Sequence, residues 1–135
     1  MVAGDAPPGE PGWRIEVAPL NVPNSPPLRF VRLARQALAT SGDVFQYVEI
    51  DGVRYSHIVN PRTGLGLTDH GLVTVIAADG MTADALATAV SVLGPRAGLR
   101  LARKVPGAAV LVTRMPAGVV ESTETRNFRQ HLEKQ

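Results

Sequence analysis

Three short stretches hold the residues whose types and spacing suit chemistry: residues 39–43, 56–64 and 81–89. The middle stretch places His57 at the end of a β-prone run, just before a turn rich in Pro and Gly. A histidine at a strand end can present an acid or base to a ligand, because its charge changes near neutral pH. By itself His57 is also compatible with a half-buried structural side chain. It is therefore a candidate general base with a structural alternative.

The third stretch contains a possible pair of metal ligands. Asp84 and Thr88 are four residues apart, which puts them one turn apart on the same face of a helix. A carboxylate and a hydroxyl are hard oxygen ligands. They suit Mg²⁺, which keeps several waters and needs few protein ligands when a phosphate shares the site. The alternative is that Asp84 adds favourable charge to the first turn of the helix while Thr88 lies at the edge of the core.

Other polar residues give weaker signals. Arg62 could hold a phosphate or carboxylate with its planar guanidinium group, and residues 41–43 could form a tight phosphate-binding turn. Both can equally be ordinary turn residues. Asp69 and His70 lie in a polar loop, where they could add a ligand or remain solvated. No nucleophile-elbow pattern supports a Ser-His-Asp triad.

The elements that must position these residues follow from the apolar pattern, which has a period of two along most of the chain and a helical period after Thr82. Asp51-Gly52 lies between two β-prone runs, which is a strong hairpin signal. We predict strands or extended segments at Trp13–Val17, Phe30–Thr40 (with a helix as the alternative), Val44–Ile50, Val53–Ile58, Leu72–Ala78, Ala108–Thr113 and Val119–Glu121. We predict one helix at Thr82–Leu93, capped by Asp79 or Thr82 and stopped by Gly94-Pro95, and a second at Arg96–Lys104. Loops are predicted at Gly4–Gly12 and Pro19–Pro27, and a terminal turn at Phe128–Leu132.

Strands outnumber helices and are joined mainly by hairpins, so the predicted class is α+β, with a mostly antiparallel sheet and two helices packed on it. We expect the strand that ends at His57 to lie beside Leu72–Ala78 in the central sheet, with the helix Thr82–Leu93 packed across them. The length of 135 residues predicts a single domain, 1–135, with residues 1–12 as a flexible, loop-like start.

The composition disfavours several classes of function. The chain has 14 basic and 12 acidic residues spread along its length, so we expect no nucleic-acid binding. It has no cysteine, which excludes disulfides, thiolate metal ligands and cysteine nucleophiles. No apolar run approaches the roughly 20 residues that a membrane helix needs, and Pro and Gly stand where a signal peptide has its apolar stretch. We therefore expect no membrane segment, export or anchoring of the chain as given.

Four motifs, taken in order, resemble the successive motifs of the ApbE family of FAD:protein FMN transferases, formerly labelled thiamine biosynthesis lipoproteins. They are Ala-Leu-Ala-Thr-Ser-Gly-Asp (37–43), Tyr-Ser-His-Ile-Val-Asn-Pro-Arg-Thr-Gly (55–64), Val-Thr-Val-Ile-Ala (73–77) and Thr-Ala-Asp-Ala-Leu-Ala-Thr-Ala (82–89). Each motif is modest evidence, whereas four at compatible spacings are strong evidence. The resemblance spans almost the whole chain and implies the T-fold-like C-terminal part of an ApbE domain.

The resemblance also implies a reaction. Members of this family cleave FAD with a divalent metal, usually Mg²⁺, transfer FMN to a Thr or Ser hydroxyl of a target flavoprotein and release AMP. By resemblance His57 would be the catalytic residue, the backbone around Ile58 and Val59 would contact the flavin, and Asp84 and Thr88 would bind the metal. FAD would be the substrate, Mg²⁺ the cofactor and a flavoprotein the partner. The family is typically bacterial, and periplasmic or anchored to the membrane by lipid.

Two departures from the family pattern affect these expectations. Asn60 stands where the family commonly has Asp, and Ala87 stands where some members have a second carboxylate, so metal binding would rest more on Asp84. The family's N-terminal part, with flavin-covering residues and further metal contacts, is missing. We therefore expect the chain to be a fragment that is inactive alone. The alternative is a non-catalytic flavin- or nucleotide-binding module, or a structural module.

Overall fold

The computed structural model describes residues 1–20 and 29–133, so most of the predicted loop Pro19–Pro27 lies outside the described residues. The strands are β1 (Val2–Ala3), β2 (Trp13–Val17), β3 (Arg29–Leu33), β4 (Gln36–Gly42), β5 (Tyr47–Ile50), β6 (Val53–Ser56), β7 (Gly71–Ala77), β8 (Ala109–Arg114) and β9 (Glu121–Glu124). The helices are α1 (Gly80–Ala102) and α2 (Arg126–His131), and a 3₁₀ turn, η1 (Pro116–Gly118), joins β8 to β9.

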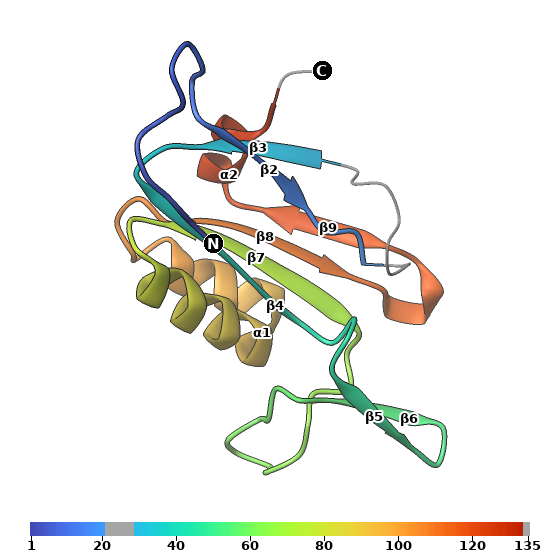
Figure 1. The fold of residues 1–135 in the computed structure, drawn as a ribbon. Helices are drawn as coiled ribbons and strands as arrows, with labels where there is room; N and C mark the ends of the chain where they lie inside the picture. Colours follow the sequence, from blue (N-terminus) through green and yellow to red (C-terminus); the bar gives the residue numbers. More distant parts are fainter. Residues whose placement is uncertain (21–28, 134–135) are drawn as a thin grey trace.

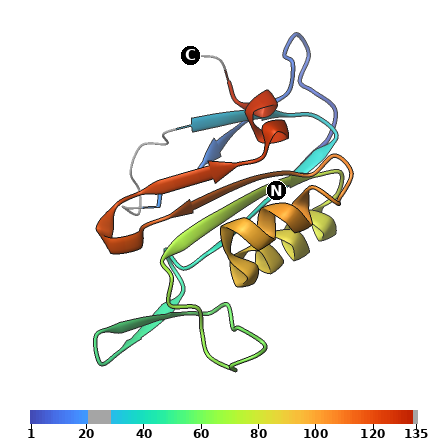
Figure 2. The ribbon, with the colours of Figure 1, turned by 180° about the vertical axis from the view of Figure 1, so that it is seen from behind.

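The central sheet has the strand order β1-β4-β7-β8-β9, and every neighbouring pair is antiparallel (Figure 1). Helix α1 covers one face, while the β2–β3 ribbon and α2 lie over the other (Figures 1 and 2). Along β7, Val73, Val75 and Ala77 pack with α1, whereas Ile76 packs with the ribbon. The predicted α+β class with a mostly antiparallel sheet and two helices is confirmed.

Helix α1 begins and breaks where its sequence predicts. Asp79 is the N-cap, because its Oδ1 accepts a 2.8 Å hydrogen bond from Thr82 N, and Thr82 Oγ1 donates to its Oδ2 at 2.8 Å. These hydrogen bonds lower the pKa of Asp79. Gly94, with φ 72° and ψ 173°, breaks the helix immediately before Pro95. The part of α1 before this break carries Asp84 and Thr88.

Two predictions about strands are wrong. Phe30–Thr40 is not one extended segment, because the chain turns at Arg35 (φ 53°) so that β3 pairs with β2 and β4 pairs with β7. The hairpin that precedes His57 does not lie beside β7. Strands β5 and β6 form their own two-stranded sheet, since the neighbours of β7 are β4 and β8. All four residues of β5 are exposed, so this strand has no buried face with which to join a covered sheet.

The hairpin itself follows its turn residues. Asp51 (φ 51°) and Gly52 (φ 74°) both have positive φ, as a type I′ turn requires. Near the other end of the chain, the predicted strand Ala108–Thr113 corresponds to β8, whereas the predicted strand Val119–Glu121 overlaps β9 only at Glu121. Within the predicted loop-like start, Val2–Ala3 pair with β4, and the amino group of Met1 donates to Leu38 O at 2.7 Å.

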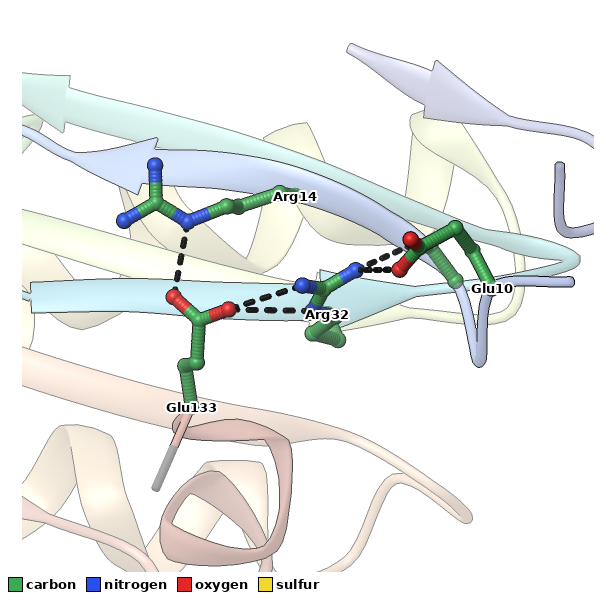
Figure 3. A network of polar contacts seen from close by, with 5 residues as sticks. Glu10, Arg14, Arg32 and Glu133 are labelled. Carbon is green, nitrogen blue, oxygen red and sulfur yellow. Dashed lines mark hydrogen bonds and ion pairs between the residues drawn. The ribbon is translucent and has the colours of Figure 1, made fainter. Parts of the chain in front are cut away.

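A network of ion pairs joins the end of the described chain to the β2–β3 ribbon (Figure 3). The carboxylate of Glu133 lies 2.7 Å from Arg14 Nε and 2.8 Å from Arg32 Nη2. Arg32 also pairs with Glu10 at 2.6 Å, and Glu133 N donates to Phe30 O at 2.9 Å. The two guanidinium groups lower the pKa of Glu133, and the carboxylates raise the pKa of Arg32.

We expect Glu133→Gln to lower the unfolding midpoint at neutral pH and to lose this effect in acid. Because the pKa of the folded-state carboxyl lies below its ordinary value of 4.5, its stabilisation is present above that value. The stabilisation is lost as the pH falls through the lowered pKa. Thermal unfolding followed by circular dichroism across this range measures the difference, with Glu121→Gln as an exposed control. A destabilisation that persists undiminished in strong acid would contradict the assignment.

Candidate functional site

His57, Asp84 and Thr88 line one cavity of about 690 Å³. His57 follows β6, whereas Asp84 and Thr88 lie on the exposed face of α1, and all three side chains are exposed. The end of β4 and the segment between β4 and β5 complete much of the wall. The structure therefore brings together the base candidate and the two candidate metal ligands, which are far apart in sequence.

The hydrogen bonds of His57 define its tautomer. Its backbone N donates to Gln46 O at 3.2 Å, and its ring Nδ1 lies 3.2 Å from the same oxygen. A carbonyl oxygen can only accept, so Nδ1 carries the proton when the ring is neutral. Nε2 then keeps its lone pair. This arrangement suits a residue that accepts a proton.

The oxygen atoms opposite His57 have the chemistry that a hard cation needs. Thr88 Oγ1 lies 3.3 Å from Ser41 Oγ, which is on β4, and Asp84 contributes a carboxylate to the same cavity, which Glu16 also lines. Within residues 1–20 and 29–133, no group of three or more His, Cys, Asp or Glu side chains is close enough to hold a metal. The donor set thus fits a cation that also takes water or phosphate oxygens, such as Mg²⁺, better than a site formed by protein ligands alone.

Ile58 and Val59 lie apart from this cavity. Ile58 is buried and lines a neighbouring cavity of about 520 Å³, which the loop 60–69 borders. Its N–H donates to Ser56 Oγ at 3.1 Å, and its carbonyl accepts from Leu67 N at 2.9 Å. Val59 is half exposed and lines neither cavity. The two cavities share Gly42 and Leu72 in their walls.

The most enclosed ionisable side chain near the site is that of Asp43, which the sequence indicated only as part of a possible phosphate-binding turn at residues 41–43. Asp43 is 2% exposed, and its Oδ1 accepts from Gly71 N at 3.1 Å and lies 2.7 Å from His70 Nδ1. Its Oδ2 lies 2.9 Å from Arg54 Nε. The sequence placed Asp43 in a turn and His70 in a polar loop. Because 27 residues separate them, no local pattern indicates that they meet.

The remaining polar candidates take ordinary roles in this structure. Arg62 is exposed, and its backbone N donates to Asn60 Oδ1 at 3.0 Å within the turn that follows His57. Asp69, whose side chain is 74% exposed, pairs with Arg114 at 2.5 Å. Neither residue lines the cavity of His57 and Asp84.

Comparison with known proteins agrees with the four motifs. The family model described as "ApbE family" matches residues 1–112. The chain belongs to the ApbE family. An ApbE relative named FAD:protein FMN transferase from Vibrio cholerae is 34% identical over 123 residues, which cover 90% of this chain and 36% of the relative. A second one, from Treponema pallidum, is 33% identical over 129 residues, with the same coverage of 90% and 36%.

Solved ApbE structures have the same fold. The ApbE protein from Thermotoga maritima superimposes with a TM-score of 0.79 at 32% identity, covering 96% of this chain and 41% of that one. The flavinyl transferase ApbE from Pseudomonas stutzeri, in its apo form, gives 0.72 at 35% identity, covering 96% and 39%. The chain thus spans little more than a third of the curated ApbE relatives, at 36% of their length. None of the helices in the described part of the chain is long and apolar enough to cross a membrane.

We expect the ring of His57 to be the Nδ1–H tautomer at a pH where it is neutral, because Gln46 O can only accept a hydrogen bond. His70 should show the same tautomer, since Asp43 Oδ1 accepts from its Nδ1. Long-range ¹H–¹⁵N NMR spectra of the uniformly labelled chain distinguish the two tautomers. A dominant Nε2–H form of His57 would contradict the role of Nε2 as a proton acceptor.

Proposed function

We propose that this chain supplies the hydroxyl-activating part of a Mg²⁺-dependent FAD:protein FMN transferase. The enzyme would transfer FMN from FAD to a Thr or Ser hydroxyl of a target flavoprotein and release AMP. One observation carries the proposal: the base candidate His57 and the oxygen pair Asp84 and Thr88 line the same cavity. Membership of the ApbE family, whose relatives are named for this reaction, supports the choice of substrate.

The chemistry assigns a separate task to each side of the cavity. Nε2 of His57 would take the proton of the acceptor hydroxyl as its oxygen attacks the phosphorus of the FMN half of FAD. The bond from that phosphorus to the bridging oxygen breaks, and AMP leaves with the bonding electrons. Asp84 and Thr88 would hold a divalent cation, which would neutralise charge on the pyrophosphate oxygens when bound. This division needs His57 and the oxygen pair to lie on opposite sides of one ligand.

The backbone of Val59, although it lines neither cavity, has more freedom to contact a flavin than that of Ile58. Both backbone groups of Ile58 already have partners within the loop. The N–H and carbonyl of Val59 have no hydrogen-bond partner among residues 1–20 and 29–133. Exposed and unpaired amide groups of this kind can bind the polar edge of a flavin ring. We therefore assign the backbone contact to Val59, and to Ile58 a buried apolar side chain that supports it.

A second candidate function is a non-catalytic module that binds flavin or nucleotide. The exposure of the cavity walls favours it for the 135 residues alone, since His57 is exposed and Phe45 is 75% exposed. Small-molecule sites usually bury most of the ligand surface. Transfer of FMN by the 135-residue chain to a target flavoprotein, with FAD and Mg²⁺ present, would exclude this second candidate.

We expect the 135-residue chain alone to bind FAD weakly, because the open cavity can enclose only part of such a large ligand. Quenching of flavin fluorescence during titration with the chain measures the affinity. We expect a dissociation constant well above the micromolar range. A sub-micromolar value would show that these residues form a complete binding surface.

We expect Asp84→Ala to abolish Mg²⁺-dependent transfer in a fusion of this chain to the N-terminal part of an ApbE relative. It removes the only carboxylate on the cavity face of α1. Thr88→Ala should reduce transfer less, because water can replace a neutral hydroxyl ligand. His57→Ala should lower the turnover number by on the order of 100- to 10,000-fold, with a smaller change in affinity for FAD.

A radiolabelled or fluorescent flavin transferred to the target protein measures these rates. Asp69→Ala is the matched control, because Asp69 lies in the loop that follows His57 yet lines only the neighbouring cavity. Full transfer by the Asp84→Ala fusion with Mg²⁺ still required would place the metal elsewhere. Full turnover by the His57→Ala fusion would assign the base to another residue.

A further inference from the structure

The two sides of the proposed site belong to parts of the fold that are joined at one point. Asp84 and Thr88 belong to α1, which packs on the central sheet. His57 belongs to the β5–β6 hairpin, which projects away from that sheet (Figures 1 and 2). Among the described elements, β5 and β6 pack chiefly against each other. The position of His57 relative to α1 therefore depends on the junction where β4 ends and β7 begins.

Asp43 occupies this junction and has contacts in three directions. Its side chain is 3% exposed, and Oδ1 accepts from Gly71 N, the first residue of β7. The same oxygen accepts from His70 Nδ1, which belongs to the loop that returns from the hairpin. Oδ2 faces Arg54 on β6 at 2.9 Å. A single carboxylate thus connects the sheet, the returning loop and the hairpin.

Arg54 attaches the hairpin to Asp43 in a defined orientation. Its Nη2 donates to the backbone carbonyl of Asp43, and its guanidinium group stacks 3.4 Å from the centre of the Tyr47 ring. Its Nε is buried and forms the ion pair with Oδ2, but it has no hydrogen-bond partner among the described residues. A planar guanidinium group held by a carboxylate, a carbonyl and an aromatic face has little rotational freedom. The contacts of Arg54 with Asp43 therefore restrict rotation of the hairpin about its long axis.

The segment after Asp43 leads directly to His57. Gln46 is three residues further along the chain, and its carbonyl accepts both from the backbone N of His57 and from ring Nδ1. Because one end of this segment is anchored at Asp43, the position of the Gln46 carbonyl, which orients the imidazole of His57, is constrained. We propose that Asp43 is a positioning residue, which sets His57 opposite Asp84 and Thr88. The consequence for turnover rests on the proposed function, whereas the consequence for hairpin orientation does not.

A purely stabilising role for Asp43 would have a different result. In that case its loss would lower the unfolding midpoint of the chain and leave the hairpin in place in the molecules that remain folded. The positioning role requires that the hairpin change orientation while the central sheet keeps its structure. Orientation and stability are measured separately, so the two roles can be distinguished.

The first experiment measures hairpin orientation in the 135-residue chain by amide residual dipolar couplings. In the unmodified chain, residues 47–50 and 53–56 should fit the alignment tensor of the central sheet. In Asp43→Ala the sheet should still fit its own tensor and the hairpin should not. Arg54→Gln should give the same result. It replaces Asp43→Ala if that variant does not fold, because it leaves the hydrogen bonds of Asp43 with Gly71 and His70 in place. Asp69→Ala is the control, because its ion pair with Arg114 is exposed.

The second experiment measures turnover in the fusion with the N-terminal part of an ApbE relative. Asp43→Ala should lower the turnover number by about 100-fold, the scale expected when a reacting group is misplaced by about 1 Å. The KM for FAD should change little, and Asp43→Asn should recover part of the loss because its amide oxygen still accepts from Gly71 N. A hairpin that keeps its orientation in both Asp43→Ala and Arg54→Gln would overturn the positioning role. An unmodified fusion without transfer activity would overturn the proposed function and leave the orientation result intact.

Discussion

The burial of β7 on both faces is the constraint on which the rest of the structure depends. Val75 and Ile76 are fully buried, and they point to opposite sides of the sheet. A strand covered on both faces needs an apolar side chain at almost every position, so it can offer few polar groups of its own. Functional groups must therefore come from the ends of the strands and from the elements that cover the sheet. Asp43, His57, Asp84 and Thr88 lie in such places.

The junction at the end of β4 shows how this constraint shapes the site. A Cβ atom at Gly42 would lie 2.4 Å from the carbonyl oxygen of Gly71, so only glycine allows β4 and β7 to approach so closely there. The next residue, Asp43, is buried but lies beyond the last apolar pair of the sheet. Burying a carboxylate without partners would cost free energy. The guanidinium group of Arg54 balances the charge of the Asp43 carboxylate. The apolar core thus ends at a buried polar residue that holds the junction together.

The sequence predicted what local periodicity and turn residues determine. The helix cap at Asp79, the break at Gly94 and the turn at Asp51-Gly52 were each indicated by residues within a few positions. The pairing of strands was harder, because four residues such as Tyr47–Ile50 fit either an edge of the central sheet or an independent hairpin. Residue types and spacing indicated His57, Asp84 and Thr88, and the resemblance to a family added Ile58 and Val59. The contacts of Asp43 join residues too far apart for any of these signals.

The two sides of the candidate site are held in place in different ways. Asp84 and Thr88 are held by a helix whose inner face packs in the core, so their positions change only if the core changes. His57 is held by a hairpin with Val48 59% and Ile50 56% exposed, which packs chiefly on itself. Apolar packing of β5 and β6 therefore contributes little to the distance across the cavity, with the buried Ile58 next to His57 as the exception. Among the polar contacts at the junction, the carboxylate of Asp43 is the group that contacts the sheet, the returning loop and the hairpin together.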